Sequence, residues 1–201
     1  DCLATLARLS RLRGYCKPIV LDASVSAGLH ATDARHPMAE AFSGTDYVPN
    51  NVRLGLANAT VYHQAPAERS HEQFERCMVL TGPNMGGKSS YIRMTALIAI
   101  MVQTGSFAPA SSVTLSPFDG LFCRMGASDA IGKGMSTLMM ELAETSKIME
   151  KATERSLIIL DELGRGTATH DGTAIASATL GHMIRSVGGT ILFVTHFPAL
   201  A

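Results

Sequence analysis

The residues best suited to chemistry form a glycine-rich run near the middle of the chain. The run fits G-x-x-x-x-G-K-[ST] without a mismatch and consists of Gly82, Pro83, Asn84, Met85, Gly86, Gly87, Lys88 and Ser89. Its glycines let the backbone wrap closely around a phosphate, with N–H groups and the positive end of a following helix facing the anion. Lys88 would add a positive charge toward the β and γ phosphates, and the Ser89 hydroxyl is the expected Mg²⁺ ligand. The run predicts a P-loop rather than a glycine-rich turn that binds nothing.

Two adjacent carboxylates supply a second group. Asp161 and Glu162 directly follow four apolar residues, 157–160. Ligands of open α/β sheets bind at the carboxyl ends of strands, so both side chains are expected near the P-loop. Asp161 would hold Mg²⁺, directly or through water, and Glu162 could orient and deprotonate the attacking water. Alone, the pair is equally compatible with an acidic helix cap; with the P-loop, it indicates a nucleotide hydrolase.

A histidine is expected at the same edge. Thr195 and His196 follow the apolar run 191–194. A lone histidine is usually structural, but this position favours a contact between His196 and the γ-phosphate.

A parallel sheet would position these groups. Buried strands are expected at the apolar runs 77–81, 157–160 and 191–194. Helices are expected over residues 1–13, 88–104, 135–154 and 171–187. Strands alternating with helices imply a parallel sheet covered on both faces. The weakly periodic region 15–76 is expected to hold several short strands and loops, including a loop over 58–75.

Composition excludes some classes of protein. The chain has 201 residues, 46% of them apolar, and Lys+Arg and Asp+Glu both number 17, as in an ordinary globular domain. A neutral balance argues against a protein that coats nucleic acid by charge alone. The longest apolar run, residues 96–102, has seven residues, whereas a membrane span needs about 20, so no membrane partner is expected. Because the sequence starts at Asp1, we expect a fragment.

The cysteines are widely spaced and suggest no chemistry. They are Cys2, Cys16, Cys77 and Cys123. No pair has C-x-x-C spacing, so neither a zinc site nor a disulfide framework is indicated. Each is expected to be a small buried group.

Five motifs follow one another in the chain: residues 35–37, 81–90, 124–127, 134–137 with Glu141, and 161–167 followed by 169–172. They are similar to those of the MutS family of DNA mismatch-repair ATPases, and the resemblance covers nearly the whole chain. Residues 89–92 and 47–51 most resemble the eukaryotic MutS homologue three subgroup. Leu138 and Ala168 depart from the phenylalanine and serine that are usual in the family.

The resemblance implies an α/β fold, a P-loop NTPase of the ATP-binding-cassette type. Its mostly parallel sheet would be flanked by helices, with a smaller N-terminal antiparallel β part. Two such domains would pair head to tail and sandwich two nucleotides, so that Ser136 faces the γ-phosphate of the partner's ATP. Ser136 alone would be a helix N-cap, and both roles can hold. Tyr47 corresponds to the aromatic residue that stacks on adenine.

The resemblance also implies an organisation and partners. Residues 1–14 would end a lever helix, and residues 15–201 would form the ATPase domain, truncated at its C-terminus. One partner would be a second MutS-homologue ATPase domain, in a heterodimer. The other would be mismatched or looped DNA, bound through domains absent here. The protein would act in the nucleus.

Two other functions stay open from the residues. One is a cassette ATPase of transport or chromosome maintenance, although the transporter signature L-S-G-G-Q is absent. The other is a nucleotide-dependent dimerisation module with little hydrolysis. The intact Lys88, Ser89, Asp161 and Glu162 weigh against it.

Overall fold

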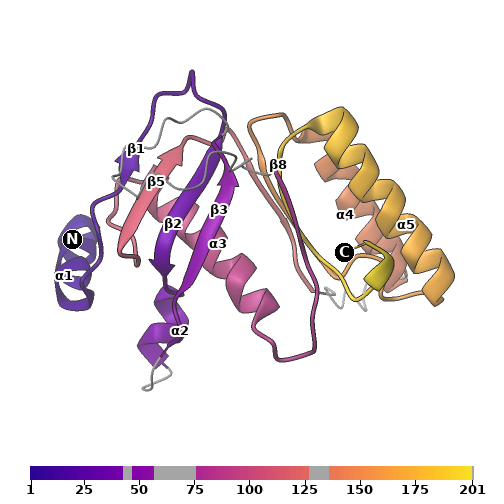
Figure 1. Cartoon of the computed structure of the whole chain (residues 1–201), viewed down its shortest axis with the longest axis horizontal. Helices are drawn as coiled ribbons and strands as arrows, with labels where there is room; N and C mark the ends of the chain where they lie inside the picture. The colour runs from indigo at the N-terminus through magenta and orange to yellow at the C-terminus, as the bar shows by residue number, and fades with distance from the viewer. Residues whose placement is uncertain (43–46, 57–75, 127–135, 201) are drawn as a thin grey trace, which may run out of the picture. The chain divides into compact units, whose positions relative to one another are not determined.

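The structure, a computed structural model, describes residues 1–42, 47–56, 76–126 and 136–200 (Figure 1). The chain forms two compact units, residues 1–75 with 90–117 and residues 76–89 with 118–201. The loop expected over 58–75 and the motif residues 127, 134 and 135 lie outside the described residues. Within the described ranges, no helix is long and apolar enough to cross a membrane.

The first unit is built on a four-stranded sheet with the order β1-β5-β2-β3. Its strands are β1 (Ile19–Val20), β2 (Gly28–Ala34), β3 (Asn50–Gly55) and β5 (Ser112–Ser116). β2 pairs antiparallel with β3 and β5, and β1 pairs parallel with β5. Leu29 lies opposite both Leu54 and Leu115, and all three are fully buried. The smaller antiparallel part of the fold is therefore confirmed, and β5 joins it from further along the chain.

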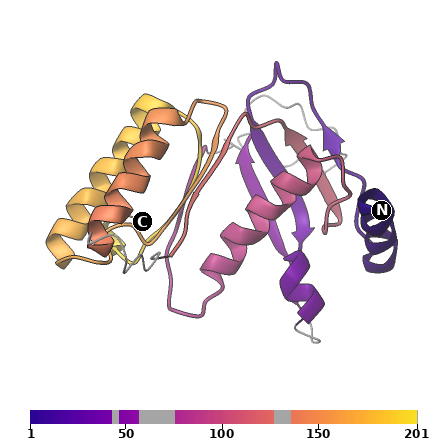
Figure 2. The same ribbon diagram turned by 180° about the vertical axis from the view of Figure 1, so that it is seen from behind.

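Helices flank this sheet. They are α1 (Cys2–Arg13), α2 (Pro37–Phe42) and α3 (Lys88–Gln103). From Ser90 onward α3 belongs to the first unit. In both ribbon views it runs along one face of the sheet (Figures 1 and 2), and its side chains Ile92 and Ile98 are fully buried. α1 ends at Gly14, whose φ of 61° is a left-handed conformation that glycine adopts readily.

Helix α2 differs from the expectation of only strands and loops over residues 15–76. Pro37 is its first residue, where proline needs no N–H partner and its fixed φ suits a helix. Nδ1 of His36 accepts hydrogen bonds from the backbone N–H groups of Met38 (3.3 Å) and Ala39 (3.2 Å). This six-residue helix is therefore set by its first turn rather than by apolar periodicity.

The second unit contains a parallel sheet with the order β4-β8-β7-β6. Its strands are β4 (Cys77–Leu80), β6 (Leu121–Arg124), β7 (Leu157–Asp161) and β8 (Thr190–Val194). Its main helices are α4 (Thr137–Lys151) and α5 (Thr169–His182). Ile148 of α4 and Ala176 and Leu180 of α5 pack with Ile158 and Phe193 of the sheet in one apolar core. The expected parallel sheet with flanking helices is confirmed.

The expected element boundaries hold to within a few residues, with one exception. The helix expected over 171–187 begins at Thr169 and changes after His182 to a π-helical turn, Met183–Val187. That turn ends at Gly188, whose φ is 70°. A short 3-10 helix, Pro198–Leu200, closes the described chain. The four cysteines, all described, are free thiols that are exposed or half-buried, so the expectation of buried thiols is wrong.

Candidate functional site

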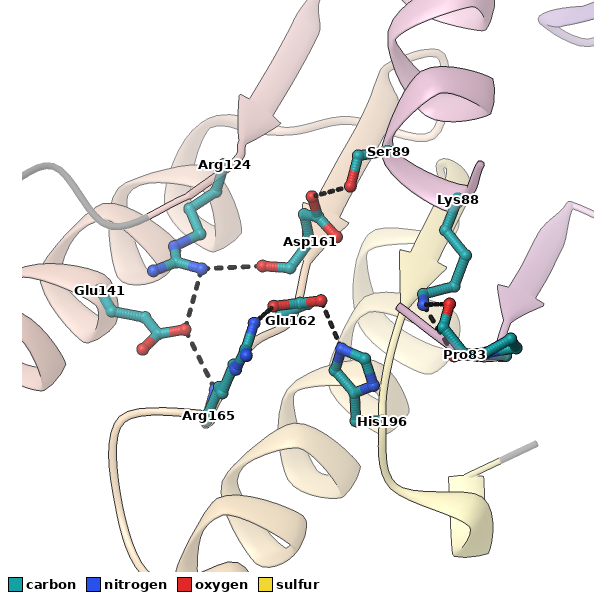
Figure 3. A network of polar contacts seen from close by, with 11 residues as sticks. Pro83, Lys88, Ser89, Arg124, Glu141, Asp161, Glu162, Arg165 and His196 are labelled. Carbon is teal, nitrogen blue, oxygen red and sulfur yellow. Dashed lines mark hydrogen bonds and ion pairs between the residues drawn. The ribbon is translucent and has the colours of Figure 1, made fainter. Parts of the chain in front are cut away.

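The P-loop joins β4 to α3, as its sequence predicts. β4 ends at Leu80 and α3 begins at Lys88, the lysine of the motif. The ammonium of Lys88 donates hydrogen bonds to the carbonyl oxygens of Gly82 (2.7 Å) and Pro83 (2.8 Å). The lysine therefore folds back over the loop, close to where a phosphate would bind (Figure 3).

The backbone of the loop uses conformations that favour glycine. Gly87 has a φ of 84°, and Met85, which has a side chain, also has a positive φ of 65°. A short turn closes where the Gly86 N–H donates to the carbonyl of Pro83 (3.2 Å). Left-handed residues next to right-handed ones turn successive N–H groups to one side, which makes an anion-binding concavity. The solvent-exposed part of the loop consists of Pro83, Asn84, Met85, Gly86 and Gly87.

Ser89 and Asp161 lie together, although 72 positions separate them in the sequence. The Ser89 hydroxyl donates to Oδ2 of Asp161 over 3.2 Å. Asp161 is the last residue of β7 and is only 7% exposed. The first turn of α3 and the carboxyl end of β7 therefore meet, as expected.

These two oxygens have the chemistry of a magnesium site. Two neighbouring ligands of an octahedral Mg²⁺, each at 2.0–2.1 Å, lie about 3 Å apart, close to the 3.2 Å between Ser89 Oγ and Asp161 Oδ2. The described residues contain no group of three or more His, Cys, Asp or Glu that could hold a metal. Mg²⁺ commonly keeps several waters and takes only one or two protein ligands beside nucleotide phosphates. The donor set fits that mode of binding.

Glu162 lies beside Asp161 but makes different contacts. Its Oε1 contacts Nε2 of His196, and its Oε2 accepts a hydrogen bond from Nη1 of Arg165 (Figure 3). Its backbone φ is 56°, a strained value for a residue with a side chain. The Glu162 N–H donates to the carbonyl of Val194 (2.9 Å), which anchors this backbone to the end of β8. The structure thus places His196 at the expected sheet edge, against a carboxylate.

Two opposing effects act on the Glu162 carboxyl. Burial alone would raise its pKa, but the hydrogen bonds and charges of His196 and Arg165 outweigh burial and lower the pKa below its usual range. The carboxyl is therefore ionised at neutral pH. The Arg165 side chain is 63% exposed, so water can compete for this contact.

A small cavity adjoins the carboxylate. It has a volume of about 180 Å³ and is lined by Glu162, Leu163, Gly164, Arg165, Thr167, Thr169, His196 and Phe197. The loop that forms this cavity packs tightly against α5. A Cβ on Gly164, whose φ is 84°, would lie 2.6 Å from the carbonyl oxygen of Gly172. Glycine is therefore required at Gly164 by both conformation and space.

A buried ion pair lies behind the carboxylates. Nη1 of Arg124, at the end of β6, is 2.9 Å from Oε1 of Glu141 on α4, and the two side chains are 7% and 5% exposed. The same Nη1 donates to the backbone carbonyl of Asp161 (2.8 Å). Oε1 of Glu141 also accepts from the Gly164 N–H (3.0 Å). One charge pair thus binds both ends of the turn 161–164.

The starts of α4 and α5 are capped differently. Ser136 is the N-cap of α4, and its hydroxyl oxygen accepts from the Met139 N–H (3.2 Å); its capping role is confirmed. Ala168 is the N-cap of α5, and no side-chain hydrogen bond caps that helix.

Tyr47 belongs to the first unit, just before β3. Its hydroxyl donates to Sδ of Met94 on α3 (3.7 Å), and its side chain is half-buried. Its stacking on adenine stays a prediction.

Sequence reasoning missed two cations of this site. Arg165 stands three positions after Glu162, a spacing at which a turn brings side chains together, and this signal could have found it. Arg124 is a single charge that ends an apolar strand. Its partners stand 17 and 37 positions away, so only the fold reveals them.

Comparison with known proteins gives a consistent result. Residues 78–201 match the family description MutS domain V. The chain is 46% identical over 202 residues to DNA mismatch repair protein msh-3 of Neurospora crassa, which covers 100% of this chain and 18% of that protein. It is 48% identical over 200 residues to Msh3 of Homo sapiens, covering 98% of this chain and 16% of that protein. It is 47% identical over 201 residues to MSH3 of Arabidopsis thaliana, covering 100% of this chain and 17% of that protein. These relatives bear out the expected subgroup, and the chain spans less than a fifth of their length.

Proposed function

Because the chain belongs to the MutS family, of which it carries domain V, the ATPase domain, we propose that it is the ATP-hydrolysing part of a DNA mismatch repair protein. ATP is its nucleotide, and Mg²⁺ is the metal that we propose accompanies it. The observation that carries this proposal is the contact between Ser89 and Asp161, which joins the P-loop to the carboxyl end of β7.

Each group of the site has a proposed role. The P-loop of residues 82–89 binds the phosphates through its N–H groups, and Lys88 leaves the loop carbonyls to contact the β and γ phosphates. Ser89 and Asp161 hold Mg²⁺, which neutralises charge on the phosphate oxygens when bound. Glu162 orients the attacking water and takes its proton, which its low pKa permits because the carboxyl is ionised.

His196 and Arg165 both act on Glu162 in this proposal. Because an ionised carboxylate only accepts hydrogen bonds, Nε2 of His196 must carry the hydrogen in its contact with Glu162. His196 thereby orients the Glu162 carboxylate next to the γ-phosphate, which His196 itself is also proposed to contact. Arg165 donates to the second oxygen, which keeps a further lone pair for the attacking water.

The site is proposed to be shared between two chains. Ser136 would reach the γ-phosphate of nucleotide held by a second MutS-homologue ATPase domain, and the partner's corresponding serine would complete this site. Tyr47 would stack on the adenine. The N-cap position of Ser136 supports this role, since the start of α4 offers N–H groups and positive potential to an anion.

The wider setting is also a proposal. The names of the relatives support a part in DNA mismatch repair. We further propose a nuclear protein with a heterodimeric partner, and with mismatched or looped DNA bound by domains outside this chain. Within the chain, residues 1–14 would end a lever helix and residues 15–201 would form the ATPase domain. The end of α1 at Gly14 supports that boundary.

One variant of the full-length dimer tests the proposed role of Glu162. Glu162→Gln is expected to keep ATP binding and to slow single-turnover hydrolysis by about 10²–10⁴-fold, the usual contribution of a general base. Matched titrations with ATP exclude a binding defect. Hydrolysis by Glu162→Gln at the wild-type rate would show that Glu162 is not the base.

A further inference from the structure

The turn 161–164 carries both proposed catalytic carboxylates, and it needs a fixed position. Asp161 and Glu162 lie on it, and its third and fourth residues are Leu163 and Gly164. At Glu162 the backbone leaves the strand with a φ of 56°, and at Gly164 the φ is 84°. Glycine adopts such a φ readily, but for Glu162, which has a side chain, the conformation is sparsely populated and persists only where its surroundings hold it.

The ion pair between Arg124 and Glu141 supplies that support from two sides. Arg124 binds the backbone carbonyl of Asp161, where the turn begins, and Glu141 accepts from the N–H of Gly164, where it ends. Both contacts are to backbone, so they fix the path of the chain and leave the carboxylates of Asp161 and Glu162 free for other partners. Figure 3 shows the pair beside the turn, to the left of the two carboxylates.

The stability of the fold does not by itself explain why a charged pair is buried at this place. Removing two charges from water is costly, and replacing a buried ion pair by apolar side chains is often neutral or stabilising. An apolar pair, however, could bind neither the carbonyl of Asp161 nor the N–H of Gly164. What the charged pair adds over an apolar one is therefore the position of the turn.

We propose that Arg124 and Glu141 are positioning residues that hold Asp161 and Glu162 in register with the P-loop. The proposal rests on the roles proposed above for those two carboxylates. Glu141 lies on α4, the helix that Ser136 caps, so the pair ties the carboxylate turn to the helix that would face the partner's nucleotide. Misplacement of catalytic groups by about 1 Å can lower a rate about 10²-fold.

The test compares three variants of the full-length dimer: Arg124→Met, Glu141→Leu and the double variant. Each single variant leaves one buried charge unpaired and is expected to lower the melting temperature. The double variant removes both charges and is expected to be more stable than either single variant. Its single-turnover rate nevertheless stays about 10²-fold below wild type, and it needs more Mg²⁺ for half-maximal rate because Asp161 has moved. ATP affinity without Mg²⁺ stays unchanged, since the P-loop is intact.

A matched control lies at the other end of β7. Ser156, 1% exposed, donates to Oδ1 of Asp119 (2.8 Å) just before the strand starts. Ser156→Ala is expected to lower the melting temperature while leaving the rate and the Mg²⁺ requirement at wild-type values. A stable double variant with wild-type rate and Mg²⁺ requirement overturns the proposal.

A second variant covers the case in which the double variant does not fold. Glu141→Asp keeps the charge pair but withdraws the carboxylate by one methylene, so it is expected to slow hydrolysis; a folded Glu141→Asp protein with wild-type kinetics also overturns the proposal. Failure of the proposed function itself looks different, because Glu162→Gln would then hydrolyse ATP at the wild-type rate.

Discussion

Replacing Lys88 by alanine should weaken ATP binding. The loss of affinity should be smaller than the full contribution of the two hydrogen bonds that Lys88 forms to phosphate. In the free chain the ammonium already makes two hydrogen bonds, at 2.7 and 2.8 Å, to the carbonyls of Gly82 and Pro83. Nucleotide binding exchanges these two hydrogen bonds for others to phosphate oxygens. The measured loss of affinity in Lys88→Ala is therefore the difference between the two sets.

The size of that difference can be worked out from the hydrogen bonds. A hydrogen bond to a charged group contributes about 1.5–3 kcal/mol, and one with charge on both partners is stronger than one to a neutral carbonyl. Two hydrogen bonds to phosphate alone would give about 3–6 kcal/mol. If breaking the hydrogen bonds to the two loop carbonyls cancels half of this gain, about 1.5–3 kcal/mol remains, which raises Kd roughly 10- to 150-fold.

Calorimetric titration with ATP measures this loss of affinity directly. Lys147→Ala removes an exposed lysine from α4 and is the control for a change of net charge. It should bind ATP like the wild type and unfold at nearly the wild-type temperature. Equal Kd values for Lys88→Ala and wild type would refute the assignment of the P-loop as the phosphate site.

Three further outcomes are expected. Arg165→Ala removes a contact that lowers the pKa of Glu162, so the acid limb of the single-turnover pH–rate profile should move to higher pH. The lowered pKa also stabilises the wild-type fold above the usual pKa of the carboxyl, and this stabilisation is lost as the pH falls through the pKa of the folded state. The stabilisation should therefore be smaller in the variant. Ser136→Ala should leave the chain's own ATP affinity nearly intact and slow hydrolysis at the partner's site, with a loss of about 0.5–2 kcal/mol in stability from the missing cap, both measurable in a dimer with one variant chain. Ala168→Ser should cap α5 and raise the melting temperature by about 2–4 °C for a gain of about 1 kcal/mol; an unchanged value would mean that the new hydroxyl does not reach the helix.

The sequence predicted the second unit more completely than the first. Residues 157–160 and 191–194 are continuous apolar runs because every position of their strands is buried, and such runs are easy to recognise. The P-loop has its own residue pattern, and its strand and helix follow from it. These features place Lys88, Ser89 and Asp161 without any structure.

Features that depend on distant partners could not be foreseen. β5 and β6 are short and partly exposed, with burial alternating or mixed along them, so no long apolar run marks them. Helix α2 depends on the side chain of His36 rather than on periodicity. The contacts of Arg124 arise only when β6, β7 and α4 come together.

The proposal that this chain carries one half of a composite ATP site can be tested on the chain itself. Its most direct test is the specific ATPase activity of the 201-residue chain as a function of its concentration, with and without a partner MutS-homologue ATPase domain. Because the loss of one preorganised donor typically lowers a rate about 10²–10³-fold, activity should be very low when dilute, rise more than linearly with concentration, and rise again when partner is added. A monomeric chain with specific activity that is independent of concentration and equal to that of the full-length dimer would contradict the claim.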